Sequence, residues 1–284
     1  MVNKKILPVL TLLILAGALG QGRAVGRMSR PQDASADAAE VGGHVSELSS
    51  PDPVKRATAA CALKRMGARA TAAIPSLVGL LADDTSIEPI RCEDVGAYKS
   101  SEKTSPGEEA AKALAAMGGA AVAPLSDALG NSNWKVRKVA AWALGEIRSA
   151  NAADRKVRVE RLTAALGDAQ WEVRSNAAWA LGELKGRTAE GQLITALSDG
   201  QPEVRRNAAW ALGELESQAA GDALIAALKD QDWVVRKNAA WALGEARKKD
   251  AAVALRAALM DEHPEVRSAA SWALEELTKK RPAN

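Results

Sequence analysis

The C-terminal half of the chain repeats one pattern of apolar and polar positions five times. The copies read NWKVRKVAAWALGEI, QWEVRSNAAWALGEL, QPEVRRNAAWALGEL, DWVVRKNAAWALGEA and HPEVRSAASWALEEL. In the third copy the apolar residues fall at positions i, i+4, i+7, i+8 and i+11, which is one stripe along an α-helix. These residues are Val204, Ala208, Ala211, Leu212 and Leu215. Each copy therefore predicts one amphipathic helix.

A shorter apolar stripe precedes each copy. In the segment GQLITALSD, Leu193, Ile194 and Leu197 also fit one face of a helix. Pro202 suits the first position of the helix that follows, and Gln201 stands at its cap. Each unit is thus expected to hold a short first helix, a turn and a second helix.

The period of the pattern is close to 30 residues. Every copy carries a tryptophan at the same place, and the spacings between these tryptophans are 37, 31, 31 and 31 residues. They are Trp142, Trp179, Trp210, Trp241 and Trp272. Such a period is typical of a solenoid, in which each unit buries its apolar face against its neighbours. The sequence predicts an all-α, right-handed superhelix of about seven helix pairs over residues 38–281.

The copies at the two ends of the array depart from this pattern. PVKRATAACALKRMG places Cys61 where the tryptophan stands elsewhere, and SPGEEAAKALAAMG places Lys112 there. Between these two segments lies an insert, residues 82–104, of the length that usually marks a functional or disordered loop. The last copy carries Glu275 in place of a glycine, as expected for the polar end of a solenoid.

A charged pair recurs with a fixed spacing. In four units an aspartate in the turn precedes an arginine in the second helix by six residues: Asp168 and Arg174, Asp199 and Arg205, Asp230 and Arg236, Asp261 and Arg267. Together with the motif VRxxAAxALGE, this spacing resembles the HEAT repeat, specifically the short bacterial form called the phycobilisome-lyase HEAT-like repeat. The resemblance covers about residues 40–280. It implies a polar Asp–Arg ladder between units and a concave surface lined by the second helices.

Tryptophan is almost the only aromatic residue, since the chain has eight Trp, one Tyr and no Phe. On a helical projection that starts at Val204, Trp210 lies at about 240°, far from the apolar stripe near 25°. Asn207 and Glu214 fall on the same side as Trp210. The resemblance places this side on the concave surface. The three columns are Trp142, Trp179, Trp210, Trp241 and Trp272; Asn176, Asn207 and Asn238; and Glu146, Glu183, Glu214, Glu245 and Glu276.

Two interpretations of these columns stay open. In one, each tryptophan packs on the neighbouring second helix, because packed helices stand about 8–10 Å apart. In the other, the rings bind a partner, since tryptophan is enriched in binding hot spots. A ring that packs on one side and stays open on the other satisfies both. We predict a surface for a protein or an extended peptide, formed by the Trp and Asn columns with Glu183, Glu214 and Glu245.

Signatures of catalysis are scarce. The two histidines, His44 and His263, are interpreted as surface or capping residues, and no HExxH, CxxC, nucleophile elbow or phosphate loop occurs. We therefore predict a non-catalytic interaction scaffold without a cofactor or a bound metal. One alternative is a chromophore lyase or its accessory, which the resemblance implies and in which a tetrapyrrole would stack on tryptophan. Another is a purely structural spacer with an unused groove.

The N-terminus has the pattern of a secretory signal peptide. Two lysines precede a 14-residue apolar stretch, which is too short to span a bilayer comfortably, and small residues follow. Cleavage is expected after Gly20 or Ala24. The expected organisation is a signal peptide (1–24), a linker (25–37), the solenoid (38–281) and a tail (282–284). The mature protein is expected in the periplasm or outside the cell, with no membrane attachment.

Removal of residues 1–24 also takes away three positive charges and brings the formal net charge from +3 to zero. Nucleic-acid binding normally needs a basic footprint, so no nucleic-acid partner is expected, and the protein is predicted to be a monomer. Exported proteins favour disulfides. The chain has two cysteines, and a Cys61–Cys92 bond is predicted to hold the insert over the N-terminal end of the groove.

Overall fold

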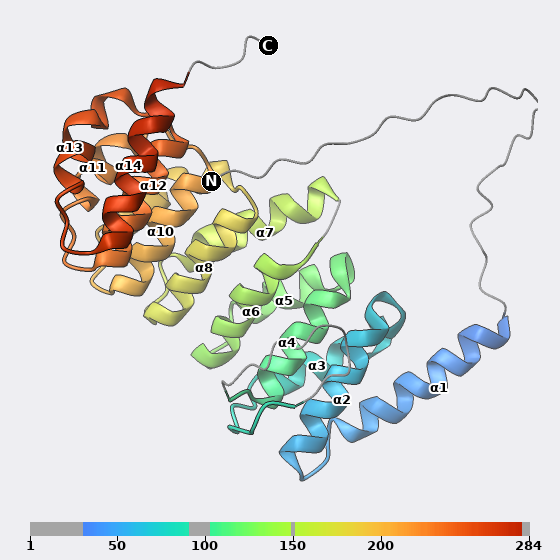
Figure 1. Cartoon of the computed structure of the whole chain (residues 1–284). Coiled ribbons are helices and arrows are strands. Elements are labelled where there is room, and N and C mark those ends of the chain that lie inside the picture. The colour runs from blue at the N-terminus through green and yellow to red at the C-terminus, as the bar shows by residue number, and fades with distance from the viewer. Residues whose placement is uncertain (1–30, 91–102, 149–150, 280–284) are drawn as a thin grey trace, which may run out of the picture.

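The computed structural model describes residues 31–90, 103–148 and 151–279. In these ranges fourteen α-helices form seven successive pairs along a curved array (Figure 1). The first helices of the pairs are α1 (Pro31–Glu47), α3 (Ile74–Leu80), α5 (Val122–Ala128), α7 (Ala152–Ala165), α9 (Glu190–Ala196), α11 (Gly221–Ala227) and α13 (Ala252–Ala258). The second helices are α2 (Pro53–Met66), α4 (Pro106–Ala116), α6 (Trp134–Glu146), α8 (Trp171–Glu183), α10 (Pro202–Glu214), α12 (Trp233–Glu245) and α14 (Pro264–Thr278). The predicted all-helical solenoid is confirmed.

Four short 3-10 turns lead into first helices, at η1 (Gly67–Ala73), η2 (Gly118–Ala121), η3 (Arg187–Ala189) and η4 (Lys249–Ala251). One boundary differs from expectation: α1 begins at Pro31, inside the segment read as a linker over residues 25–37. The predicted signal peptide, the insert residues Cys92 and Tyr98, and the 282–284 tail lie outside the described residues. None of the described helices is long and apolar enough to cross a membrane.

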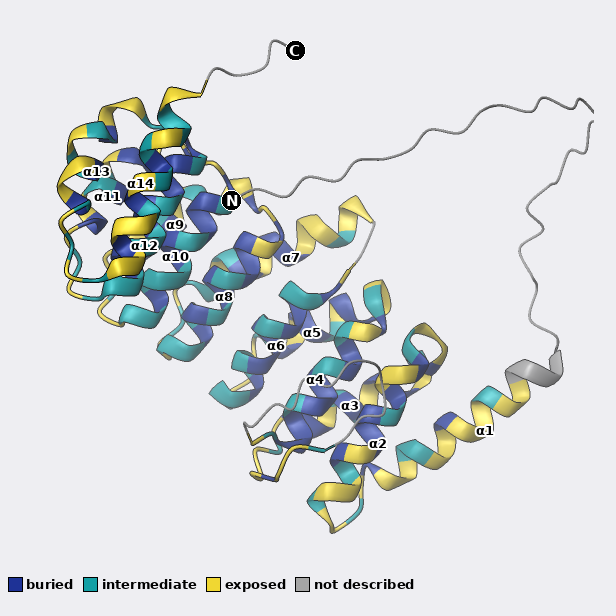
Figure 2. Ribbon diagram, in the orientation of Figure 1, coloured by how far each residue is buried: buried dark blue, intermediate teal, exposed yellow. Residues whose placement is uncertain are grey.

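The second helices form one layer of the array and the first helices form the other (Figure 1). Neighbouring second helices pack closely against one another, whereas neighbouring first helices touch far less. In a curved array the closer-packed layer lies on the inner side. Small residues allow this spacing: Ala208, Ala209 and Ala211 of α10 are fully buried, and Leu212 reaches between the layers. Figure 2 shows buried residues of this kind in the successive second helices.

A ladder of ion pairs joins the turns, as the resemblance implied. Arg174 donates from Nε and Nη2 to the carboxylate of Asp199 at 2.7 and 2.9 Å, and from Nη1 to the backbone carbonyl of Asp168 at 2.9 Å. The same carboxylate accepts the backbone N–H of Gln201. Bidentate hydrogen bonds between arginine and a carboxylate are among the stronger hydrogen bonds in proteins. The equivalent pairs are Arg56–Asp83, Arg137–Asp168, Arg205–Asp230 and Arg236–Asp261.

The ladder is interrupted at α4. Gly107 stands where the other second helices carry the arginine, and Asn131 stands where the next turn would carry the aspartate. The backbone N–H of Gly107 donates to the carbonyl of Asp83 at 2.9 Å, and a Cβ here would lie 2.8 Å from that oxygen. Ile87 and Thr104 form an antiparallel bridge beside it. These backbone contacts join the two ends of the insert. They lie where the other units have the arginine of an Asp–Arg ion pair.

One buried charge had no signal in the repeat pattern. α7 has 14 residues where α9 has 7, which accommodates the longer spacing between Trp142 and Trp179. Arg158 of α7 is only 1% exposed, and its Nη1 donates to the carbonyls of Leu144 and Ile147 at 3.0 and 2.7 Å. Burial lowers the pKa of Arg158. The guanidinium thus satisfies carbonyls at the end of α6.

Candidate functional site

Each tryptophan from the second to the last of the column packs on a glycine of the preceding second helix. A Cβ added to Gly182 would lie 2.5 Å from Cζ3 of Trp210 and 3.0 Å from Cα of Ala211. Real Cβ atoms essentially never come this close, so only glycine leaves room for the ring. The same relationship joins Gly145 to Trp179, Gly213 to Trp241 and Gly244 to Trp272. The packing interpretation of these tryptophans therefore has direct structural support.

The rings are nevertheless only half-buried, because one side remains accessible on the inner layer. All five tryptophans of the column fall in this intermediate class, and all five border the buried core. The two interpretations are thus compatible: one edge of the ring meets the preceding glycine in Trp179, Trp210, Trp241 and Trp272, while the rest of the ring can meet a partner. The helical projection separates the tryptophans from the apolar stripe, but it does not reveal their contact with glycine.

The asparagine column contacts the protein itself. Nδ2 of Asn176 donates to the backbone carbonyl of Lys138 at 2.9 Å, Nδ2 of Asn207 to that of Ser175 at 3.0 Å, and Nδ2 of Asn238 to that of Arg206 at 2.9 Å. Each acceptor lies in the preceding second helix. These amides therefore hold neighbouring second helices together, and the contact of Asn176, Asn207 and Asn238 with a partner stays a prediction.

The glutamate column lies at the C-terminal ends of the second helices. Glu183 is exposed, whereas Glu214 and Glu245 are half-buried. The C-terminal end of a helix carries partial negative charge, so a row of carboxylates there strengthens a negative potential. Burial raises the pKa of Glu245, and repulsion from Glu216, Glu214 and Glu276 raises it further. This end of the inner layer is therefore a place where positive charge is favoured.

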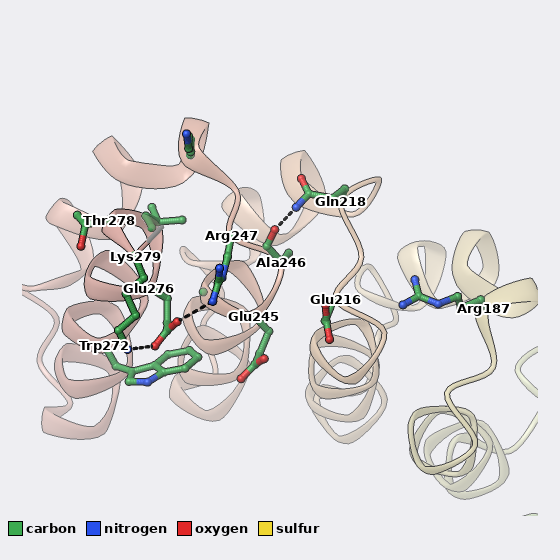
Figure 3. Close-up of a pocket in the computed structure, with 13 residues that line it drawn as sticks. Arg187, Glu216, Gln218, Glu245, Ala246, Arg247, Trp272, Glu276, Thr278 and Lys279 are labelled. Carbon is green, nitrogen blue, oxygen red and sulfur yellow. Dashed lines mark hydrogen bonds and ion pairs between the residues drawn. The ribbon is translucent and has the colours of Figure 1, made fainter. Parts of the chain in front are cut away.

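A pocket of about 1220 Å³ opens at this edge, between the ends of α10, α12 and α14 (Figure 3). We call it the C-terminal pocket. It brings together Trp272 and Glu245 from the predicted surface with Glu276 of the same column. Sequence reasoning missed the residues contributed by the turns after the second helices, namely Arg187, Glu216, Gln218, Arg247 and Lys249.

Trp142 lies apart from this pocket. It borders a smaller hollow of about 230 Å³ with Asn176, Lys112 and Lys138. Lys112 stands in the tryptophan position of α4, and its Nζ donates to Glu109 at 2.7 Å. This hollow therefore places two lysines beside Trp142, and one of them, Lys112, takes the position that tryptophan holds in the five second helices that follow.

Cys61 is 3% exposed and is disulfide-bonded, but Cys92 lies outside the described residues, so the Cys61–Cys92 pairing stays a prediction.

Across residues 31–90, 103–148 and 151–279, no group of three or more His, Cys, Asp or Glu is arranged to hold a metal ion. His263 stacks on Trp233, with ring centroids 5.0 Å apart, and stands at the N-cap of α14.

The sequence matches the family profile described as HEAT repeats over residues 99–155, 159–231 and 221–283. No curated protein matches the chain.

Solved structures show the same architecture. An engineered protein is 25% identical, with 87% of this chain and 71% of that one covered and a TM-score of 0.53. The Escherichia coli protein YibA is 23% identical, with 70% and 69% covered and a TM-score of 0.54. A designed armadillo repeat protein in complex with the peptide (KR)4 is 22% identical, with 84% and 100% covered and a TM-score of 0.51. These likenesses concern the fold.

Proposed function

Because the chain belongs to the HEAT repeat family, whose fold is typical of non-catalytic scaffolds, we propose that it is an interaction scaffold for an extended, basic peptide segment. The segment lies along the inner layer, against the tryptophan and glutamate columns. One observation carries this proposal: each of the last five second helices presents a half-buried tryptophan and, one turn further on, a glutamate. A repeated pair of an aromatic ring and a carboxylate suits repeated lysine or arginine side chains.

The spacing of the array agrees with an extended ligand. Packed helices stand about 10 Å apart, and an extended peptide advances about 3.3 Å per residue. One unit of the array therefore corresponds to about three peptide residues. The acidic column supplies charge complementarity, which favours specificity and fast association.

A fold neighbour gives a concrete ligand for the test. The designed armadillo repeat protein described above is in complex with the peptide (KR)4. Its similarity to this chain extends to the fold, so it supports the choice of peptide and not the position of a site. The three asparagines are not part of the proposed surface, since their amides hold neighbouring helices.

The test is a titration of the protein, cleaved after Ala24, with fluorescently labelled (Lys-Arg)4 and (Asp-Glu)4 peptides. We expect (Lys-Arg)4 to bind and to shift the tryptophan emission, and (Asp-Glu)4 not to bind. The variant Glu183→Gln/Glu214→Gln should bind (Lys-Arg)4 about tenfold more weakly, since it removes two solvent-accessible ion pairs that are each worth about 0.2–1 kcal/mol. The control Glu40→Gln/Glu160→Gln changes two exposed glutamates of first helices. Equal loss in both variants would contradict a site on the inner layer.

Localisation and the two alternative functions each have their own test. We propose that the protein acts after export, in the periplasm or outside the cell. The short bacterial lyase-type subfamily and the chromophore-lyase alternative rest on the sequence resemblance, and no contact among the described residues favours them. Visible absorbance of the purified protein would reveal a bound tetrapyrrole. A protein that binds neither pigment nor peptide would leave the spacer alternative.

A further inference from the structure

Three turns that follow second helices carry a charged residue in the left-handed conformation. Lys185, Glu216 and Arg247 have φ values of 48°, 49° and 49°, and they occupy the same place in successive units. Each one terminates its helix; the backbone N–H of Glu216, for example, donates to the carbonyl of Gly213 at 2.8 Å. Glycine adopts this conformation at the lowest cost. The turn itself therefore does not require these long side chains.

In two of the three units the side chain forms an ion pair with the column glutamate of the next unit. Nζ of Lys185 lies 3.8 Å from Oε2 of Glu214. Nη2 of Arg247 lies 3.6 Å from Oε2 of Glu276, a contact drawn in Figure 3. The repeating geometry thus places a cation beside a column glutamate on each side of Glu245.

The unit between them reverses the charge. Glu216 stands where its neighbours have Lys185 and Arg247, and the column glutamate of the next unit is Glu245. Among the described residues, neither Glu216 nor Glu245 forms an ion pair or a side-chain hydrogen bond. Two carboxylates therefore occupy a place at which the flanking units hold one carboxylate and one cation.

Both carboxylates border the C-terminal pocket, together with the ring of Trp272 (Figure 3). Four cations also line this pocket: Arg187, Arg247, Lys249 and Lys279. Arg247 and Lys279 are already paired with Glu276, and no ion pair joins Arg187 or Lys249 to Glu216 or Glu245 among the described residues. The pocket is open and, at about 1220 Å³, large enough to admit a long side chain from a peptide on the inner layer.

We infer that Glu216 and Glu245 together receive one arginine side chain of the bound peptide, in the place that Lys185 and Arg247 fill in the flanking units. This inference rests on the proposed function, since it names the side chain that the groove takes at one position. A guanidinium presents several donors in one plane and can bridge two carboxylates, and it can also stack on an indole ring. The flanking ion pairs show that the same repeat geometry accommodates a long cationic side chain.

The experiment places a cationic side chain of the protein itself beside Glu245, where the peptide arginine is proposed to bind. The variant Glu216→Arg gives this unit the charge pattern of its neighbours, and Glu216→Gln removes one carboxylate with little change of shape. Glu160→Arg, on the exposed surface of α7, makes the same change of charge far from the pocket. Labelled (Lys-Arg)4 is titrated into each protein at 150 mM salt, and the melting temperature of each protein is recorded.

We expect Glu216→Arg to weaken (Lys-Arg)4 binding by more than about tenfold and Glu216→Gln by a smaller factor, whereas Glu160→Arg changes it by less than about twofold. Glu216→Arg should melt no lower than the wild type, because its new guanidinium pairs with Glu245. Equal affinities of Glu216→Arg and Glu160→Arg would overturn the inference. If Glu216→Arg unfolds, unchanged affinity of Glu216→Gln overturns it instead. A wild-type protein that does not bind the peptide contradicts the proposed function and this inference with it.

Discussion

The indole of Trp210 occupies the space that a side chain on Gly182 would need, since Cζ3 lies 2.5 Å from the position of a Cβ on that glycine. Gly182→Ala should therefore destabilise the array, although alanine is otherwise the better helix former by about 1 kcal/mol. Forcing a methyl group into a packed interface typically costs about 1–3 kcal/mol. The control is Gly191→Ala in α9, where a Cβ meets nothing within 4 Å. Urea unfolding of both variants measures the difference, and an equally stable Gly182→Ala would show that the ring moves freely.

The Asp–Arg ladder makes stability depend on pH. A hydrogen bond from Arg137 lowers the pKa of Asp168, although burial opposes it, and the pKa values of Asp199, Asp230 and Asp261 are lowered as well. Their folded pKa values lie below those of the unfolded chain, near 3.9. The ladder's contribution is thus fully present above that value and is lost as the pH falls through the folded values. Melting temperatures recorded from pH 7 to pH 2 should drop steeply below about pH 4.

The variant Asp168→Asn isolates one rung of this ladder. It removes the charge from the partner of Arg137, so it should cost about 2 kcal/mol at pH 7 and should flatten the acid dependence by one group. A profile as steep as that of the wild type would assign the acid sensitivity to other carboxylates.

The asparagine amides hold helices together, so their loss should affect stability and spare binding. Asn176→Ala and Asn238→Ala each remove one hydrogen bond to the preceding second helix, and Asn207→Ala removes two, to the carbonyl and the hydroxyl of Ser175. Each bond is worth about 0.5–1.5 kcal/mol. The triple variant should unfold at lower urea concentration and bind (Lys-Arg)4 as the wild type does. Loss of peptide binding by a variant that is still folded would return these residues to the binding surface.

Much of the architecture could be predicted, because it depends on short-range spacing. The stripe from Val204 to Leu215 defines a second helix, and the six-residue Asp–Arg spacing predicted the ladder through family resemblance. Contacts between units are harder to predict. A helical projection places Trp210 off the apolar stripe but cannot show that its ring meets Gly182, one unit away. The replacement of the equivalent glycine by Glu275 in the fifth copy was the available signal.

Other features had no periodic signal. Arg158 lies in the unit with the 37-residue spacing, so no alignment with its neighbours suggests that it is buried. α1 was read as starting near residue 38 because the residues before it are small and polar, yet Pro31 and the alanines that follow suit the first turns of a helix. Glu216 has no signal of its own in the sequence, because its significance depends on the ion pairs that Lys185 and Arg247 form at the same position of the flanking units.

Export is a prediction of the N-terminal sequence alone. The 14-residue apolar stretch between two lysines and a run of small residues is expected to direct secretion, with cleavage after Gly20 or Ala24. N-terminal sequencing of protein recovered from the medium or periplasm of a bacterial expression host identifies the first residue. Recovery of intact Met1 in the cytosolic fraction would refute this prediction.

The predicted Cys61–Cys92 bond can be tested in the same preparation. Thiol titration of the unfolded, non-reduced protein should find no free thiol, and peptide mapping should recover the two cysteines in one linked fragment. In the chain-entropy estimate, closing a loop of about 30 residues stabilises by about 3–4 kcal/mol. Reduction should therefore lower the melting temperature, and Cys61→Ser/Cys92→Ser should melt where the reduced wild type does. Two free thiols would rule the bond out.

The contact between a tryptophan and the glycine of the preceding unit is interchangeable along the array. Trp241 would find the same partner on Gly182 as on Gly213, because the two glycines occupy one position of the same motif. Excision or duplication of one 31-residue unit would therefore restore the same tryptophan–glycine contact between the two second helices that become neighbours. Unequal recombination between the near-identical copies could lengthen or shorten the groove by about 10 Å at a time. Under the proposed function, the length of peptide that the inner layer binds would then change in steps of about three residues. The fold would be preserved at each step.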